Sequence, residues 1–174
     1  MLPDTVIETQ TLSVADILWD AESLTLDVRF AVPDAVIPRT PPLVSRVETA
    51  VGIPQPMYRL ALGDLMLSGD SNRLLSGFDI RRAPTGWHRQ SLDPIETSTK
   101  GAIRLDADFD ENGLASVDAD IDITVDDARG LLSIERRPCP PIAVWVEVAI
   151  GVVAGLDEGG GIAAFRLTAG PDLP

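Results

Sequence analysis

The stretch IRLDADFDENGLASVDADIDITV, residues 103–125, decides the predicted fold class. Along both halves of it, apolar and polar side chains alternate one by one, which places the apolar residues of a β-strand on a single face. The letters ENG between the halves end at Gly113, a residue suited to a left-handed turn. The stretch therefore predicts an antiparallel hairpin in which Ile103 lies opposite Ile121 and all apolar side chains share one face.

The same alternation recurs on both sides of this stretch. Residues 24–32 indicate a half-buried strand, and residues 142–168 indicate a second hairpin with its turn at 156–161. The first strand of that hairpin, residues 142–153, is apolar on both faces. Such a pattern is typical of a strand that is covered from both sides.

Turn formers and prolines interrupt the strand pattern. Residues 40–52 combine a capping residue, prolines in the first turn and one apolar stripe, so they predict a short helix, with a strand as the alternative. Residues 126–132 predict one helical turn. Residues 68–99 are rich in turn formers and arginine, and they predict a long irregular loop. The fold class that follows is mainly β: an antiparallel β-sandwich or partly open β-barrel with one or two short helices, in a single domain over residues 1–174.

The chain of 174 residues carries 14 Lys and Arg against 27 Asp and Glu, a formal net charge of -13. Such a charge repels the phosphates of nucleic acids and anionic lipid headgroups, so neither is expected as a partner. The longest strongly apolar run, residues 142–156, is too short for a helix across a bilayer. No secretory signal is seen, so we expect a cytoplasmic protein or a component of an assembled particle. A single cysteine, Cys139, excludes a disulfide within the chain.

Aspartates crowd the polar face of the predicted hairpin. In its register Asp106 lies opposite Asp118, and Asp108 and Asp110 lie on the same side. Because like charges directly opposite each other destabilise a strand pair, this face is either fully solvated or neutralised by a cation or an arginine-bearing partner. Residues 108–113 also resemble the opening half of an EF-hand calcium loop, although an alanine stands where that loop has a bidentate glutamate. We expect no cofactor, with a weak calcium site on these four aspartates as the alternative.

The only histidine, His88, lies between Asp79 and Asp93 in the sequence, with several serines nearby. A Ser-His-Asp arrangement could be assembled from these residues, but no Gly-x-Ser-x-Gly spacing surrounds any serine. We therefore predict no catalytic residues, and His88, Asp79 and Asp93 are named only as candidates. One histidine and one cysteine also argue against a zinc site.

An arginine-rich cluster precedes the acidic stretch. It combines planar guanidinium donors with an aromatic side chain, a composition that binding hot spots favour. Its members are Arg81, Arg82, Trp87, His88 and Arg89. We predict a binding surface here; the alternative is that the arginines pair with carboxylates of the chain itself.

No arrangement of residues in the sequence has the pattern of an enzyme site. We therefore predict a non-enzymatic binding or assembly module, a subunit of a larger bacterial or viral protein complex. Its partner would be another protein or further copies of the chain, bound through a sheet edge or the arginine-rich cluster. The alternative is a small-ligand-binding β-barrel, or a small hydrolase that uses His88, with a pocket under residues 68–99.

Overall fold

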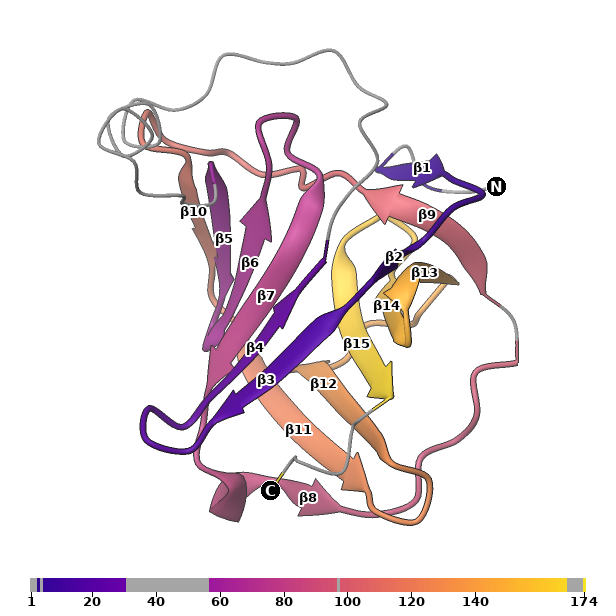
Figure 1. Ribbon diagram of the computed structural model, residues 1–174. Helices are drawn as coiled ribbons and strands as arrows, with labels where there is room; N and C mark the ends of the chain where they lie inside the picture. The colour runs from indigo at the N-terminus through magenta and orange to yellow at the C-terminus, as the bar shows by residue number, and fades with distance from the viewer. Residues whose placement is uncertain (1–2, 4, 31–56, 97, 169–173) are drawn as a thin grey trace.

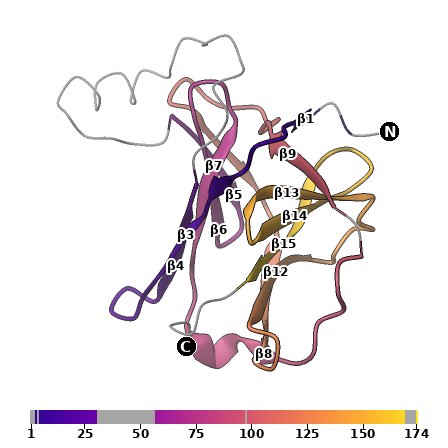
Figure 2. The ribbon, with the colours of Figure 1, turned by 45° about the vertical axis from the view of Figure 1, so that its right-hand side comes forward.

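Two mixed β-sheets pack face to face in the computed structural model, and Figure 2 shows the two layers. The structure describes residues 3, 5–30, 57–96, 98–168 and 174. The helix predicted for residues 40–52 lies outside the described residues. The predicted strand at 24–32 is described up to Phe30, and residues 25–29 are extended, as expected.

The smaller sheet has six strands, which run diagonally across the left half of Figure 1. In spatial order they are β10 (Leu114–Val117), β5 (Tyr58–Leu62), β6 (Leu65–Gly69), β7 (Leu75–Arg81), β4 (Thr25–Arg29) and β3 (Asp16–Asp20). All neighbours pair antiparallel except β10, which runs parallel to β5. Along β5 and β6 buried and half-buried residues alternate strictly, so one face of the sheet packs inward and the other faces outward.

The larger sheet has nine strands. In spatial order they are β1 (Val6–Glu8), β9 (Thr99–Ile103), β13 (Val144–Ile150), β14 (Val152–Leu156), β15 (Ile162–Thr168), β12 (Leu131–Arg137), β11 (Asp120–Asp126) and β8 (His88–Arg89), and β2 (Ser13–Val14) also pairs with β13. Three of its pairs are parallel: β9 with β13, β2 with β13, and β8 with β11. Both sheets are therefore mixed rather than purely antiparallel.

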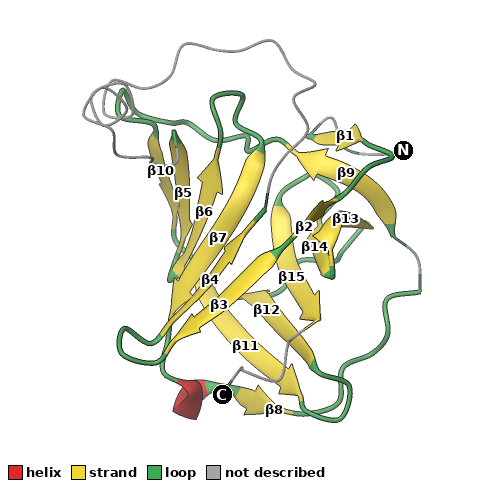
Figure 3. Ribbon diagram, viewed as in Figure 1, coloured by secondary structure: helices red, strands yellow, loops and turns green. Residues whose placement is uncertain are grey.

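The core lies between the two sheets. Phe78 of β7 stacks on Phe165 of β15 with ring centroids 4.2 Å apart, and both rings are buried. Leucine, isoleucine and valine side chains from both inner faces surround this pair. The predicted mainly β, sandwich-like fold is thus confirmed. Within the described residues the one helical element is the 3-10 turn η1 (Pro84–Gly86), drawn in red in Figure 3. The same part of the chain contains no helix of the length and hydropathy that a membrane span requires.

The predicted hairpin over residues 103–125 is wrong, although its segments are largely extended. Its two arms do not pair: β10 lies in the smaller sheet, and β13, β14, β15 and β12 separate β9 from β11 in the larger one. In β11, Asp120 lies opposite Arg137 of β12, and Arg137 forms an ion pair with Asp122. Asp120 thus lies opposite an arginine, as in the predicted register, but that arginine is Arg137 rather than Arg104. The stretch crosses from one sheet to the other and back.

Residues 142–153 form two strands rather than the predicted single one. Strands β13 and β14 fold back on each other at Gly151, whose φ of +79° lies in the left-handed region that glycine adopts at little cost. Each strand therefore has its own inward face, which explains why apolar residues occur on both faces of the sequence pattern. The turn predicted at 156–161 is confirmed, and it joins β14 to β15.

Part of the predicted irregular loop at 68–99 is a strand. Residues 75–81 form β7, which lies between β6 and β4 in the smaller sheet. Residues 90–96, here named the strap, are irregular and lie against the outer face of the larger sheet. The backbone N–H of Leu92 donates to Asp126 Oδ2 at 3.0 Å, and the guanidiniums of Arg129 and Arg166 donate to the strap carbonyls of Leu92 and Asp93. Residues 127–130 form a tight turn instead of the predicted helical one.

Candidate functional site

The three candidate catalytic residues lie on different elements. His88 is exposed on β8, opposite Thr124 of β11. Asp79 lies on the outer face of the smaller sheet, and Asp93 is exposed in the strap. Among the described residues no hydrogen bond or ion pair joins the His88 ring to either carboxylate. The geometry thus does not bring these three residues together as a catalytic triad, and they stay candidates only.

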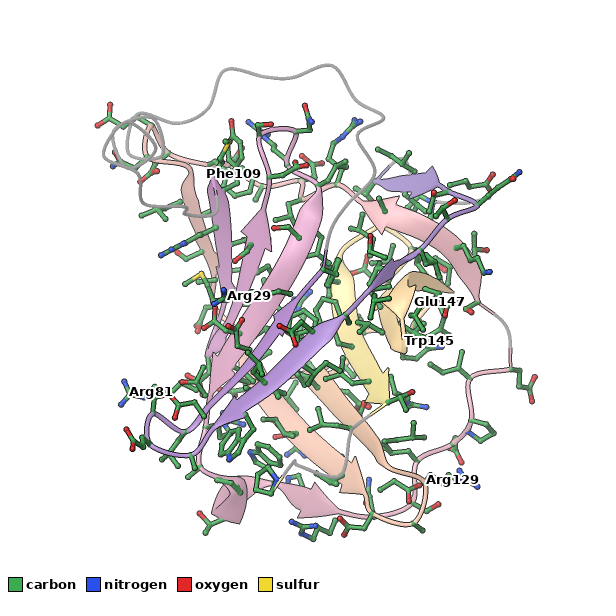
Figure 4. The ribbon with its side chains drawn as sticks, in the orientation of Figure 1. Arg29, Arg81, Phe109, Arg129, Trp145 and Glu147 are labelled. Carbon is green, nitrogen blue, oxygen red and sulfur yellow. The ribbon has the colours of Figure 1, made fainter. Side chains whose placement is uncertain are left out.

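Asp79 has a particular electrostatic environment. It lies directly opposite Asp27 of β4. Partial burial, followed by repulsion from Asp27, raises the pKa of the Asp79 carboxyl above its ordinary value, while the charges of Arg59 and Arg29 act in the opposite direction. Asp27 itself forms an ion pair with Arg29 at 2.6 Å. The site is an open sheet face on which like and unlike charges mix, and Figure 4 labels Arg29 there.

The residues of the predicted arginine-rich cluster differ in burial and in their partners, and a binding role for them stays a prediction. Trp87 is buried, and its ring meets that of Trp19 edge-on at 5.4 Å. Arg82 forms an ion pair with Asp64 at 2.7 Å, and Arg89 forms one with Asp127 at 2.6 Å. Pairing with the chain's own carboxylates, the alternative named from the sequence, is thus what these two arginines do. The other two members, Arg81 and His88, are exposed.

The four aspartates of the calcium alternative are all exposed, as the sequence predicted: Asp106, Asp108, Asp110 and Asp118. Asp110 Oδ1 accepts hydrogen bonds from the backbone N–H groups of Asn112 and Leu114, at 2.9 and 2.8 Å, and so closes a turn. Within the described residues no three His, Cys, Asp or Glu side chains come close enough together to hold a metal ion. The geometry therefore offers the calcium alternative no cluster of ligands.

A cavity of about 170 Å³ lies between the sheets at one edge of the molecule. The smaller sheet contributes strands β5 and β10 to its wall, and the larger sheet contributes the ends of β9, β12 and β15. The wall is mostly apolar. Its apolar side chains are Leu60, Leu62, Ile103, Leu105, Val117 and Ile162. The glycine-rich turn at 159–161 and Thr5, whose Oγ1 donates to the carbonyl of Gly160 at 3.3 Å, complete the wall beside three charged residues.

Two arginines line this cavity, Arg104 and Arg136. Arg136 follows Leu132 and Ile134 on the inward face of β12, a position where a charged side chain is unusual. Its Nη1 donates to the carbonyl of Ile162 at 3.4 Å. Arg104 follows the last residue of β9, and its backbone N–H donates to the carbonyl of Thr5 at 2.7 Å. The side chain of Arg136 and the backbone of Arg104 are thus each held at the edge of the core by one hydrogen bond.

The guanidiniums of these two arginines carry more donors than the protein satisfies. Each has five N–H donors. In both Arg104 and Arg136 the Nε atom is buried and has no hydrogen-bond acceptor in the described part of the chain. Most buried polar groups in proteins are hydrogen-bonded. Buried donors without an acceptor also occur in Arg73, Trp87 and Arg166, so what sets this place apart is that two arginines line one cavity. The third charged residue of the wall is Asp106.

Sequence reasoning missed this site. It placed Arg104 on the polar face of a hairpin that does not form, and it gave no role to Arg136. The signal that could have found Arg136 is its spacing: it continues the two-residue period of Leu132 and Ile134, so a charged residue stands at a core position. No protein-family model matches the chain, and no curated protein matches it. The cavity is therefore interpreted from its own residues alone.

Proposed function

We propose that this chain is a non-enzymatic binding module whose ligand occupies the cavity between the two sheets. The observation that carries the proposal is the pair Arg104 and Arg136 beside a cavity to which both sheets contribute apolar side chains. Binding sites for small molecules are typically concave and apolar, with a few convergent polar groups that fix orientation and specificity. This cavity has both properties.

The chemistry of the cavity favours holding a ligand over converting it. A guanidinium remains protonated at every physiological pH, so it binds an anion but does not move a proton. The described residues of the wall include no histidine or cysteine. His88, on which the predicted hydrolase alternative depends, is not part of the wall, so we do not extend the proposal to hydrolysis.

The proposal is tested by closing the cavity. Val117 on β10 lines the cavity and is 42% exposed, so Val117→Phe is expected to obstruct it without disturbing the core. Leu114→Phe is the matched control, because Leu114 lies on the same strand, is 48% exposed and does not line the cavity. Ligand-observed NMR with a library of small fragments should find compounds that bind the wild type and Leu114→Phe but not Val117→Phe. If no compound in the library depends on Val117, the proposed function is lost.

A second function, assembly with a protein partner, is favoured by a different observation. Val14 of β2 and Ile150 of β13 are register neighbours, and they are 74% and 58% exposed. Neighbouring exposed apolar side chains are typical of contact surfaces. The partner we propose is a basic protein in a larger complex rather than a second copy, because two chains of net charge -13 repel each other.

Light scattering coupled to size-exclusion chromatography distinguishes a second copy of the chain from a different protein as the partner. The chain alone is expected to have the mass of a monomer at 0.15 M salt. A photo-crosslinking residue at position 150 should then label one basic protein in the native host, and the same residue at position 114 should not. A dimer mass that Ile150→Asp abolishes would show instead that a second copy occupies this surface.

A further inference from the structure

The size and the wall of the cavity limit the ligand. A cavity of about 150 Å³ lined by apolar side chains is large enough to bind benzene. The cavity here measures about 170 Å³, so it accommodates a compact apolar body of the size of a single aromatic ring. Leu60 and Leu62 come to that space from β5 of the smaller sheet, and Ile103 comes from the end of β9 in the larger sheet.

The charges at the cavity limit the ligand further. Arg104 and Arg136 contribute two guanidiniums, and Asp106 contributes one carboxylate, so a single positive charge is in excess. A guanidinium presents a planar fork of donors that matches the two oxygens of a carboxylate. A monoanion neutralises the excess charge, whereas a dianion such as phosphate would leave one negative charge beside Asp106.

From these two limits we infer that the ligand is a small monocarboxylic acid with a compact apolar body, bound with its carboxylate on Arg104 and Arg136 and its body between the sheets. The inference rests on the proposed function and names the class of ligand for the same cavity. It also explains why an acidic protein places two arginines beside a space lined by apolar side chains.

The test compares benzoate, benzyl alcohol and inorganic phosphate as probes in isothermal titration calorimetry with the full chain. Benzoate should bind with half-saturation near or below about 1 mM, and benzyl alcohol at least about tenfold more weakly, because a charge-assisted hydrogen bond contributes about that factor. Arg104→Met and Arg136→Met should each weaken benzoate binding about tenfold or more and leave benzyl alcohol unaffected. Arg81→Met is the matched control, because Arg81 is exposed on β7 and does not line the cavity.

Arg104→Lys and Arg136→Lys keep the positive charge and lose the planar fork of donors. They replace the methionine variants if one of those fails to fold, and circular dichroism measures whether each variant is folded. They should weaken benzoate binding as well. If benzyl alcohol binds as tightly as benzoate and only Val117→Phe abolishes binding, the cavity function stands and the carboxylate inference fails. If phosphate displaces benzoate at equal concentration, the apolar part of the inference fails. If no probe binds in a way that depends on Val117, the inference fails together with the proposed function.

Discussion

Asp79 and Asp27 face each other across β7 and β4, and this pair destabilises the smaller sheet at neutral pH. The folded pKa of Asp79 is raised above its ordinary value of 3.8, by burial first and by Asp27 second. The ionised carboxylate is therefore disfavoured in the folded chain. The resulting loss of folding stability is fully present above the folded pKa of Asp79, and it disappears as the pH falls below about 3.8.

Asp79→Asn should for this reason stabilise the protein at pH 7, by a few tenths of a kcal/mol up to about 1 kcal/mol, the range of cross-strand pair effects. Urea denaturation at pH 7 and at pH 3.5 measures the change in the free energy of unfolding. The gain should shrink toward zero at pH 3.5. Asp118→Asn, at an exposed position, serves as the control and should be nearly neutral at both values. Equal gains at the two pH values would contradict the electrostatic explanation.

Asp126 has the opposite dependence on pH. Its carboxylate accepts the backbone N–H of Leu92 at 3.0 Å and that of Arg129 at 3.2 Å, and the first of these bonds is the main reason why the pKa of Asp126 is lowered from 3.8. Its contribution to stability is thus complete above that value and is lost as the pH falls through the lower folded pKa.

Asp126→Ala should release the strap, so amide hydrogen exchange at Leu92 should become at least about tenfold faster at pH 7. Asp127→Ala is the neighbouring control, and unchanged exchange in Asp126→Ala would show that the strap is held by other contacts.

One type of turn occurs three times in the part of the chain that the structure describes. In each, Oδ1 of an aspartate accepts the backbone N–H groups two and four residues later, at 2.8 to 2.9 Å: Asp70, Asp110 and Asp157. The N–H of the aspartate also donates to the carbonyl four residues later. The fourth residue of each turn has a positive φ, namely Arg73 (63°), Gly113 (75°) and Gly160 (79°). The aspartate and the left-handed residue together define the turn.

Gly113→Ala should therefore destabilise the protein by about 1 kcal/mol, because a Cβ is unfavourable in the left-handed region. Asp110→Ala should cost a similar amount, since two backbone donors lose their acceptor. Glu111→Ala, an exposed position in the same turn, should change little. Thermal and urea unfolding measure all three. A neutral Gly113→Ala would show that the turn tolerates another conformation.

At the level of strands, the sequence predicts which residues are extended better than it predicts which strands pair. Alternation correctly placed Ile121, Ile123 and Val125 in the core and Asp120 in solvent, but Asp126 is buried. It could not show that β10 pairs with β5, because that partner lies far away in the sequence. A local turn is compatible both with a hairpin and with a chain that crosses between the two sheets. The choice is made by long-range charge and packing, such as Asp120 opposite Arg137.

The cavity exists only once the two sheets are in place, and this is why sequence reasoning did not find it. Arg136 belongs to β12 of the larger sheet, Arg104 follows the last residue of β9, and Val117 reaches the same space from the smaller sheet. Their proximity follows from how the sheets are assembled, not from spacing along the chain. The sequence singled out His88 and the exposed aspartates because their residue types are common in functional sites. The cavity residues can be recognised only from where the fold places them.

The net charge of -13 affects the whole molecule. In a compact chain this excess destabilises the folded state by repulsion among its own charges. Raising the ionic strength from 0.01 M to 0.15 M shortens the screening length from about 30 Å to about 8 Å, so distant carboxylates no longer repel each other. The melting temperature should then rise by about 2–4 °C, which for a chain of this size corresponds to about 1 kcal/mol. Calorimetry in sodium chloride, choline chloride and calcium chloride at equal ionic strength measures the effect. Equal shifts in all three salts are expected from general screening, and a larger shift in calcium chloride alone would reveal a specific cation site that the described geometry does not contain.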